Sequence, residues 1–163
     1  MAIMDSRLEF SSAQTMIKTA SATPFNSTSD IALTAVRDLG QGQPVYLVVA
    51  VGDTAIITAG SAGTMKFLLV SDAATACATD GTATIHAASE EFITDDLAAE
   101  IEPLKANRIL WSIALPSEGV AYEAILGLQV IIATTNTTAG TLDAYLTLTP
   151  PTSRVGGYND GTN

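Results

Sequence analysis

From residue 45 onward, short apolar runs alternate with polar stretches rich in turn formers. The run Val45–Val51 follows glycines and Pro44, is rich in β-branched residues, and predicts a strand buried on both faces. Further strand-like runs lie at Met65–Val70, Ala83–Ala87, Ile109–Leu115, Tyr122–Thr134 and Thr141–Thr149. Because several short strands spaced by turn signals are typical of a sandwich, we predict an all-β, jelly-roll-like antiparallel sandwich.

Two connecting segments add detail to this outline. Thr94–Leu104 begins with a threonine suited to capping a helix, continues with Asp95 and Asp96, and carries apolar residues at helical spacing. It predicts at most one short helix, which Pro103 ends after about two turns. The Thr/Asn/Gly-rich stretch 135–140 lies between the last two strand-like runs and predicts a hairpin.

The N-terminal segment does not follow this strand pattern. Residues 11–34 are rich in Ser, Thr and Ala, so alone they bury too little apolar surface to offset the entropy of ordering. Ahead of them, Leu8 and Phe10 alternate with polar residues and would form one apolar face on an extended arm. Such an arm can add a strand to another sheet or lie in a groove. The residues that we expect to contact another chain are Ile3, Met4, Leu8 and Phe10.

These patterns divide the chain into three parts. Residues 1–37 are expected to form an N-terminal arm and an irregular segment, and residues 38–150 the β-sandwich domain. Residues 151–163 are rich in Pro, Gly and Asn and are expected to form a flexible C-terminal tail. The length of 163 residues suits one domain with one core.

Composition narrows the classes of partner. Seven Lys and Arg against 17 Asp and Glu give a net charge of −10, and the basic residues are scattered, so we expect no nucleic-acid binding. The longest apolar run, Val45–Val51, is far shorter than the ~18 residues of a spanning helix, so we expect no membrane insertion. Asp5, Arg7 and Glu9 interrupt the apolar N-terminus, which argues against a signal peptide. The single cysteine, Cys77, cannot form an internal disulfide.

The spacing of the reactive side chains does not match a catalytic or metal site. His86 is the only histidine, and Glu90 and Glu91 lie too far along an extended chain to converge with it. Adjacent carboxylates point to opposite faces of a strand, so such pairs favour surface charge or helix capping over catalysis. Asp72 and Asp80 lack the spacing of a calcium loop. We therefore expect no enzyme activity, no metal and no cofactor.

Five stretches, spread over most of the chain, carry a resemblance to a known family. They are MDSRLEFSSAQ (Met4–Gln14), DLGQGQPVYLVV (Asp38–Val49), LVSDAA (Leu69–Ala74), ALP (Ala114–Pro116) and TTAGTLDAYLT (Thr137–Thr147). Together they resemble the pattern of the capsid cement, or decoration, proteins of short-tailed bacteriophages. The segment 94–108 departs from that pattern, because it is more acidic and more helix-like.

The resemblance implies a jelly-roll domain that sits as a homo-oligomer on the outer face of an icosahedral shell and clamps neighbouring major capsid proteins. It implies no enzyme activity and no cofactor. It also implies that the protein is made in the host cytoplasm and resides on the outer surface of the virion. In this setting the apolar N-terminal residues contact the capsid or a sister subunit, and linking several copies strengthens attachment by raising effective concentration.

Two other functions stay open from the sequence. The first is a glycan- or host-binding jelly roll, which needs aromatic side chains around one shallow site, although the aromatic content is only 6%. Its aromatic residues would be Trp111, Tyr122, Tyr145 and Tyr158. The second is a small hydrolase built on His86, Glu91 and Asp95, whose spacing argues against it.

Overall fold

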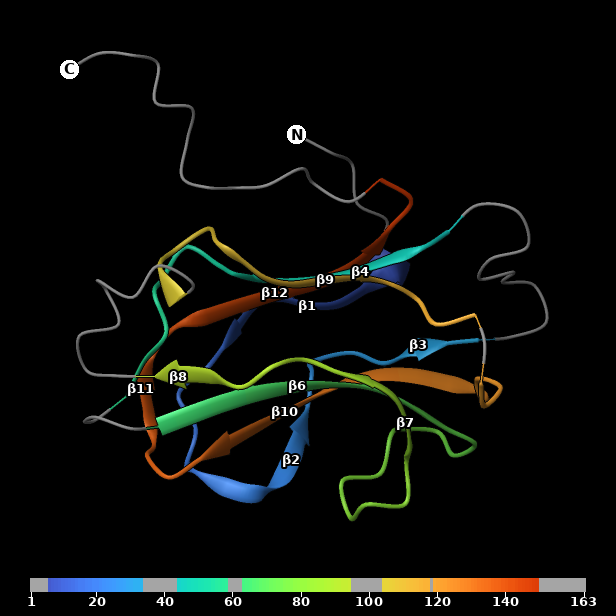
Figure 1. Ribbon diagram of the computed structural model, residues 1–163, viewed down its shortest axis with the longest axis horizontal. Coiled ribbons are helices and arrows are strands. Elements are labelled where there is room, and N and C mark those ends of the chain that lie inside the picture. Colours follow the sequence, from blue (N-terminus) through green and yellow to red (C-terminus); the bar gives the residue numbers. More distant parts are fainter. Residues whose placement is uncertain (1–5, 34–43, 59–62, 95–103, 118, 150–163) are drawn as a thin grey trace.

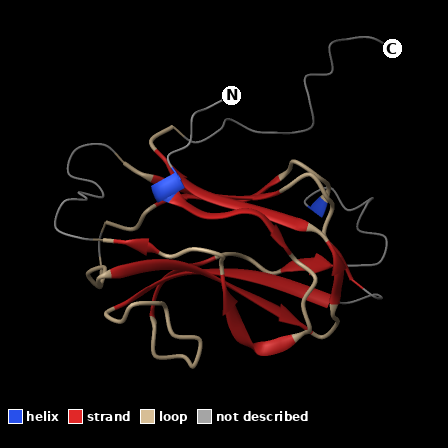
Figure 2. Ribbon diagram, turned by 180° about the vertical axis from the view of Figure 1, so that it is seen from behind, coloured by secondary structure: helices blue, strands red, loops and turns tan. Residues whose placement is uncertain are grey.

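The computed structural model describes five stretches of the chain, and every structural statement below concerns these residues alone. They are 6–33, 44–58, 63–94, 104–117 and 119–149. Their regular elements are a 3-10 turn, η1 (Ser6–Leu8), and twelve β-strands, which make up both layers of the molecule (Figure 2). The strands are β1 (Glu9–Thr15), β2 (Ser21–Asn26), β3 (Ile31–Ala32), β4 (Tyr46–Val51), β5 (Ile57–Thr58), β6 (Gly63–Asp72), β7 (Thr84–Ala88), β8 (Phe92–Thr94), β9 (Ile109–Ala114), β10 (Ile125–Ala133), β11 (Thr137–Ala139) and β12 (Thr141–Thr147).

Two antiparallel sheets lie one above the other (Figure 1). The smaller sheet has the order β1-β12-β4-β9. The larger sheet has the order β2-β10-β6-β7, with the short β3 beside β10 and the short β8 beside β6. β11 and β5 form a separate two-stranded pair at one end of the sandwich (Figure 1).

The order in which the chain visits the two sheets is that of a jelly roll. Of the eight main strands, the smaller sheet takes the first, third, sixth and eighth, and the larger sheet takes the other four. Only one main connection, from β6 to β7, stays within a sheet, while every other one crosses between the layers. This winding confirms the predicted all-β, jelly-roll-like antiparallel sandwich.

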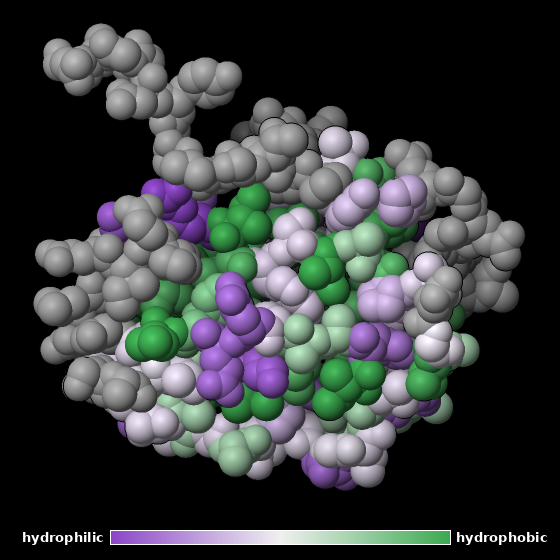
Figure 3. Space-filling view, in the orientation of Figure 1, coloured by the Kyte–Doolittle hydropathy of each residue, from purple (hydrophilic) through white to green (hydrophobic). Residues whose placement is uncertain are grey.

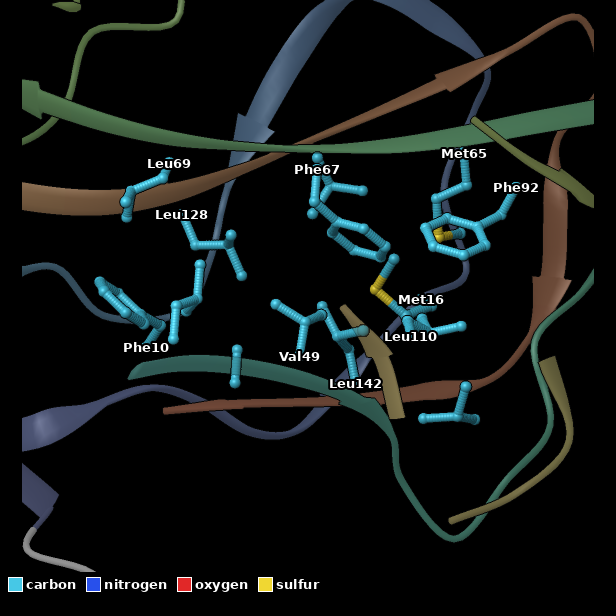
Figure 4. Packing of buried hydrophobic residues seen from close by; sticks show 14 of the residues in the cluster. Phe10, Met16, Val49, Met65, Phe67, Leu69, Phe92, Leu110, Leu128 and Leu142 are labelled. Carbon is cyan, nitrogen blue, oxygen red and sulfur yellow. The ribbon is translucent and has the colours of Figure 1, made fainter. Parts of the chain in front are cut away.

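The core lies between the two sheets and is filled from both (Figure 4). In β12, Leu142, Ala144 and Leu146 are buried and alternate with half-buried residues, as expected for a strand with one face on the core. Phe67 from β6 and Phe92 from β8 pack with ring centroids 5.9 Å apart. The apolar runs of the sequence therefore supply the two inner faces of the sandwich.

The six strand-like runs expected from the sequence all contain strands, namely β4, β6, β7, β9, β10 and β12. The short helix expected over Thr94–Leu104 lies mainly outside the described residues, which omit 95–103. Of its two ends, Thr94 belongs to β8 and Leu104 is buried in the core.

The hairpin expected at residues 135–140 is wrong. β10 and β12 lie in different sheets, and the segment between them forms β11, which pairs with β5. Gly140 has a φ of +128°, where L side chains are strained, and a Cβ there would lie 2.8 Å from Ile56 Cα. This stretch therefore carries the chain from one sheet to the other. Alternation alone cannot distinguish paired neighbours from strands that face each other across a core.

The expectation that residues 1–37 lie outside the sandwich is wrong for the part that the structure describes. β1 pairs with β12 at one edge of the smaller sheet, and β2 and β3 both pair with β10 in the larger sheet. Phe10 and Met16 are fully buried and lie among the core side chains (Figure 4). The physical reason is that this segment, although poor in apolar side chains, forms backbone hydrogen bonds with β12 and β10 and buries the large side chains of Phe10 and Met16.

Phe10→Ala is expected to lower the free energy of unfolding by about 3–5 kcal/mol, because it leaves a cavity between the sheets. The matched control is Ser12→Ala on the same strand, where the side chain is exposed and the change stays within about 0.5 kcal/mol. Denaturant unfolding measures both. Equal stability of the two variants would contradict the placement of Phe10 in the core.

Candidate functional site

The four residues expected to contact another chain do not form one surface in the structure. Phe10 lies fully buried in the core of its own chain, so the prediction that it contacts a capsid or a second subunit is wrong. Leu8 is partly buried against the same core. Ile3 and Met4 lie outside the described residues. Leu8 lies at the end of the turn η1, and Phe10 lies in β1, an edge strand of the protein's own sheet.

A polar cluster that the sequence did not predict joins β6, β7 and the connection before β10. Ser71 Oγ lies 2.7 Å from His86 Nε2 and accepts a hydrogen bond from the Glu123 N–H at 3.1 Å. Thr84 Oγ1 donates to Glu123 Oε1 at 2.7 Å. The rings of Tyr122 and His86 lie with centroids 4.2 Å apart. We call these five residues the His86 cluster.

The His86 cluster favours a neutral imidazole. Burial lowers the pKa of His86, and the Glu123 carboxylate opposes this with a smaller effect. Because Ser71 Oγ accepts the Glu123 N–H, its own proton is free to bond Nε2 of the neutral ring.

The distance between Ser71 and His86 would suit a nucleophile and its base, but their surroundings do not suit attack on a substrate. Ser71 is 0% exposed. The Tyr122 ring lies against the imidazole, and its hydroxyl donates to the Pro116 carbonyl at 2.9 Å. The cluster therefore ties two strands of the larger sheet to the connection that leads to β10. Fifteen residues separate Ser71 from His86, and only the β6–β7 pairing brings them together.

A second polar cluster holds the loop after β6 against the outer face of the larger sheet. The Cys77 N–H donates to Asp30 Oδ2 at 3.1 Å, and Asn26 Nδ2 donates to the Cys77 carbonyl at 2.6 Å. Gln129 Nε2 donates to the Ala78 carbonyl at 2.8 Å and to Asn26 Oδ1 at 3.0 Å. These bonds satisfy polar groups that would be costly to bury unpaired.

Cys77 lies directly over a glycine of β10. A Cβ on Gly127 would lie 2.5 Å from Cys77 Sγ and 2.9 Å from Asp30 Oδ1. Burial, followed by the nearby carboxylates, raises the pKa of the Cys77 thiol to about 12, so the thiol is protonated at neutral pH. Burial also raises the pKa of Asp30. The close fit makes this loop sensitive to any side chain added at Gly127.

The carboxylates considered as calcium ligands bond to their own loop. Asp72 accepts hydrogen bonds from the N–H groups of Ala74 and Ala78, which lower its pKa. Asp80 accepts from the hydroxyl and the N–H of Thr82, which lower its pKa in the same way. In the part of the chain that the structure describes, no three Asp, Glu, His or Cys side chains gather as a metal site would need.

The residues of the two alternative functions are not brought together in the described part. Trp111 packs against the core from β9, whereas Tyr145 lies on the outward side of β12, in alternation with buried residues. Tyr158 lies outside the described residues. Of the hydrolase set, Glu91 is exposed ahead of β8, and Asp95 lies outside the described residues.

The surface carries large apolar side chains among polar ones, as Figure 3 shows for one face. The most exposed are Val120, at 68%, before β10, and Ile93, at 66%, in β8. The other three are Ile17, Ile85 and Leu148. None of the described helical segments has the length and apolarity that crossing a bilayer requires.

No protein-family model matches the chain, and no curated protein matches it significantly. The fold alone therefore sets its class, an all-β, jelly-roll-like sandwich protein.

Lowering the pH is expected to destabilise the protein through His86. The folded pKa of His86 lies below its ordinary value of 6.5, so the unfolded chain binds the proton more readily. The stabilising effect of the neutral ring is complete above about pH 6.5 and is lost as the pH falls through the folded pKa. Melting curves of the wild type and His86→Gln between about pH 7.5 and about pH 5 measure this. A difference between the two that stays constant with pH would contradict the prediction.

Gly127→Ala is expected to lift the loop after β6 and to speed modification of Cys77 by a thiol reagent at least about tenfold, since the wild-type thiol is buried and protonated. The control is Ala76→Ser, an exposed position in the same loop. Equal labelling rates for Gly127→Ala and wild type would show that the loop does not rest on this glycine.

Proposed function

We propose that this protein is a structural virion protein that binds the outer surface of a bacteriophage capsid and cements neighbouring major capsid proteins. It acts as a homo-oligomer and without catalysis, cofactor, nucleic acid or membrane. Its place of action is the virion surface, after synthesis in the host cytoplasm.

One observation carries this proposal. Three stretches that resemble the cement family are far apart in the sequence, at Met4–Gln14, Asp38–Val49 and Thr137–Thr147. In their described parts they supply β1, β4 and β12, which lie side by side in the smaller sheet in the order β1-β12-β4. A resemblance that falls on three neighbouring strands of one sheet supports a shared fold, because the matching residues then pack on each other.

The chemistry of the described residues supports a structural role over an enzymatic one. The serine–histidine pair lies inside a hydrogen-bonded cluster with Ser71 fully buried, and the thiol of Cys77 is buried and protonated. Phe10 is fully buried in the core, so a capsid contact has to use other apolar residues. The exposed side chains of Ile93 and Val120 are suited to this role, since they can lose water on binding without any change in the core.

The double variant Ile93→Asp/Val120→Asp is expected to fold normally and to bind capsids at least about tenfold more weakly, because charges replace apolar contacts that must be desolvated. The measurement is co-sedimentation with bacteriophage shells that lack a decoration protein, with melting curves on the same samples. Thr28→Asp/Thr75→Asp is the control, which adds the same charge at exposed polar positions outside β8, β9 and the connection before β10. Wild-type protein that does not sediment with the shells would contradict the proposed function.

A further inference from the structure

The two sheets have four edges within the described residues, and each edge presents backbone groups that are not used by the sheet. β1 and β9 are the edges of the smaller sheet. β2 and β3 share one edge of the larger sheet, and β7 and β8 share the other. Unpaired N–H and C=O groups along a regular strand are a template for another strand, so the regularity of each edge decides whether it can be extended.

Three of the four edges have no run of more than three residues that pairs without a register shift. β1 pairs with β12 through two register shifts, and its Ala13 has a φ of 49°. β2 contains Pro24, which lacks an N–H, and pairs with β10 through a further shift. The remaining edge is divided between β7, which has a register shift, and β8, which has three residues. Bulges, proline and short length each hinder the addition of a strand.

The edge formed by β9 is uncharged, and its one register shift lies at its start, between Ile109 and Trp111. From Trp111 to Ala114 it pairs residue by residue with β4, with no register shift. Its sequence, ILWSIA, contains no charged residue and no proline. Ser112 and Ala114 are exposed, and no strand among the described residues pairs with the other side of β9 (Figure 1). Of the four edges, this one has the longest run without a register shift or a proline, so it is the best suited to continue a sheet.

We propose that β9 is the contact between copies of this chain, pairing antiparallel with β9 of a second copy across a twofold axis. This inference rests on the proposed function in so far as the protein acts as a homo-oligomer. Pairing across the axis joins the two four-stranded smaller sheets into one continuous sheet and closes the contact at two copies. It uses the same edge from both partners, over the four residues Trp111–Ala114 that pair with β4 without a register shift.

Charge favours a second copy as the occupant of this edge. The chain has 17 acidic and seven basic residues, so most ways of bringing two copies together oppose carboxylates. Between Arg108 and Glu118 the sequence has no charged residue at all. Two β9 strands can therefore meet without a pair of like charges facing each other.

The only tryptophan of the chain reports on this contact. Trp111 lies in β9, packs against the core and is partly exposed. A strand added beside β9 covers part of its remaining surface, so its fluorescence emission shifts to the blue when copies associate. Dilution reverses the shift.

The test compares two double variants that add the same charge to the two edges of the smaller sheet. Ser112→Lys/Ala114→Lys places lysines at exposed positions of β9, and Ser12→Lys/Thr15→Lys does so on β1. Analytical ultracentrifugation and Trp111 emission are followed across a dilution series. We expect the β9 variant to raise the dissociation constant at least about tenfold and the β1 variant to change it less than about threefold. Backbone hydrogen exchange of the wild type provides a measurement without mutation, and β9 amides should exchange more slowly in the concentrated sample.

Several results would overturn the inference. They are a wild type that stays monomeric, an oligomer unaffected by the β9 lysines, and β9 amides whose exchange does not depend on concentration. If the β9 variant loses its fold, the exchange measurement decides alone. An oligomer that pairs through β9 but does not bind shells would contradict the proposed function and leave the β9 contact standing, so the two failures are distinguishable.

Discussion

The antiparallel pairing of β1 with β12 joins the beginning of the described chain to its end, and the rest of the sandwich depends on it. The ladder runs from Glu9 opposite Tyr145 to Thr15 opposite Thr141. Beyond it, the Met16 N–H donates to the Gly140 carbonyl at 2.9 Å, and the Thr137 hydroxyl donates to the Met16 carbonyl. With the backbone held in this way, Phe10 and Met16 are fixed in the core, and β12 has a neighbour on both sides. Contacts between residues so distant in sequence form slowly, because a long loop has to close before they are made.

The larger sheet depends on buried polar groups as well as on apolar packing. The His86 cluster ties the connection before β10 to β6 and β7, and the second cluster holds the loop after β6 over Gly127. Both clusters bind loops to the sheet through hydrogen bonds whose partners come from distant parts of the sequence. Such bonds fix the position of a loop more specifically than apolar contacts do, because a displaced polar group stays buried and unpaired.

The sequence predicted the framework of the fold well, because strands that form a core have a strong local pattern. The run Val45–Val51 contains β4, and the alternating run at Thr141–Thr149 contains β12. The local pattern does not show which strands pair. The segment 135–140, expected to be a hairpin between β10 and β12, is therefore a crossing between the two sheets. The N-terminal strands were missed for a related reason. Their apolar content is low, and hydrogen bonds to β12 and β10 provide what their side chains do not.

The candidate sites were less predictable than the fold. Phe10 was read as a contact for another chain because an alternating pattern shows that one face is apolar but not which surface covers it. Ser71 and His86 have no local signal, since the register of β6 against β7 brings them together. The long unshifted run of the β9 edge also becomes visible only when the register shifts and the proline of all four edges are placed in their sheets.

The proposed function, a structural component of a capsid surface, is tested directly by a density map of the intact particle. We expect a two-layered sandwich on the outer face of the shell, seated over the junctions between major capsid proteins, with adjacent copies meeting at β9. Particles whose shells carry no such density, or which hold the protein inside the shell or in the tail, would contradict the account.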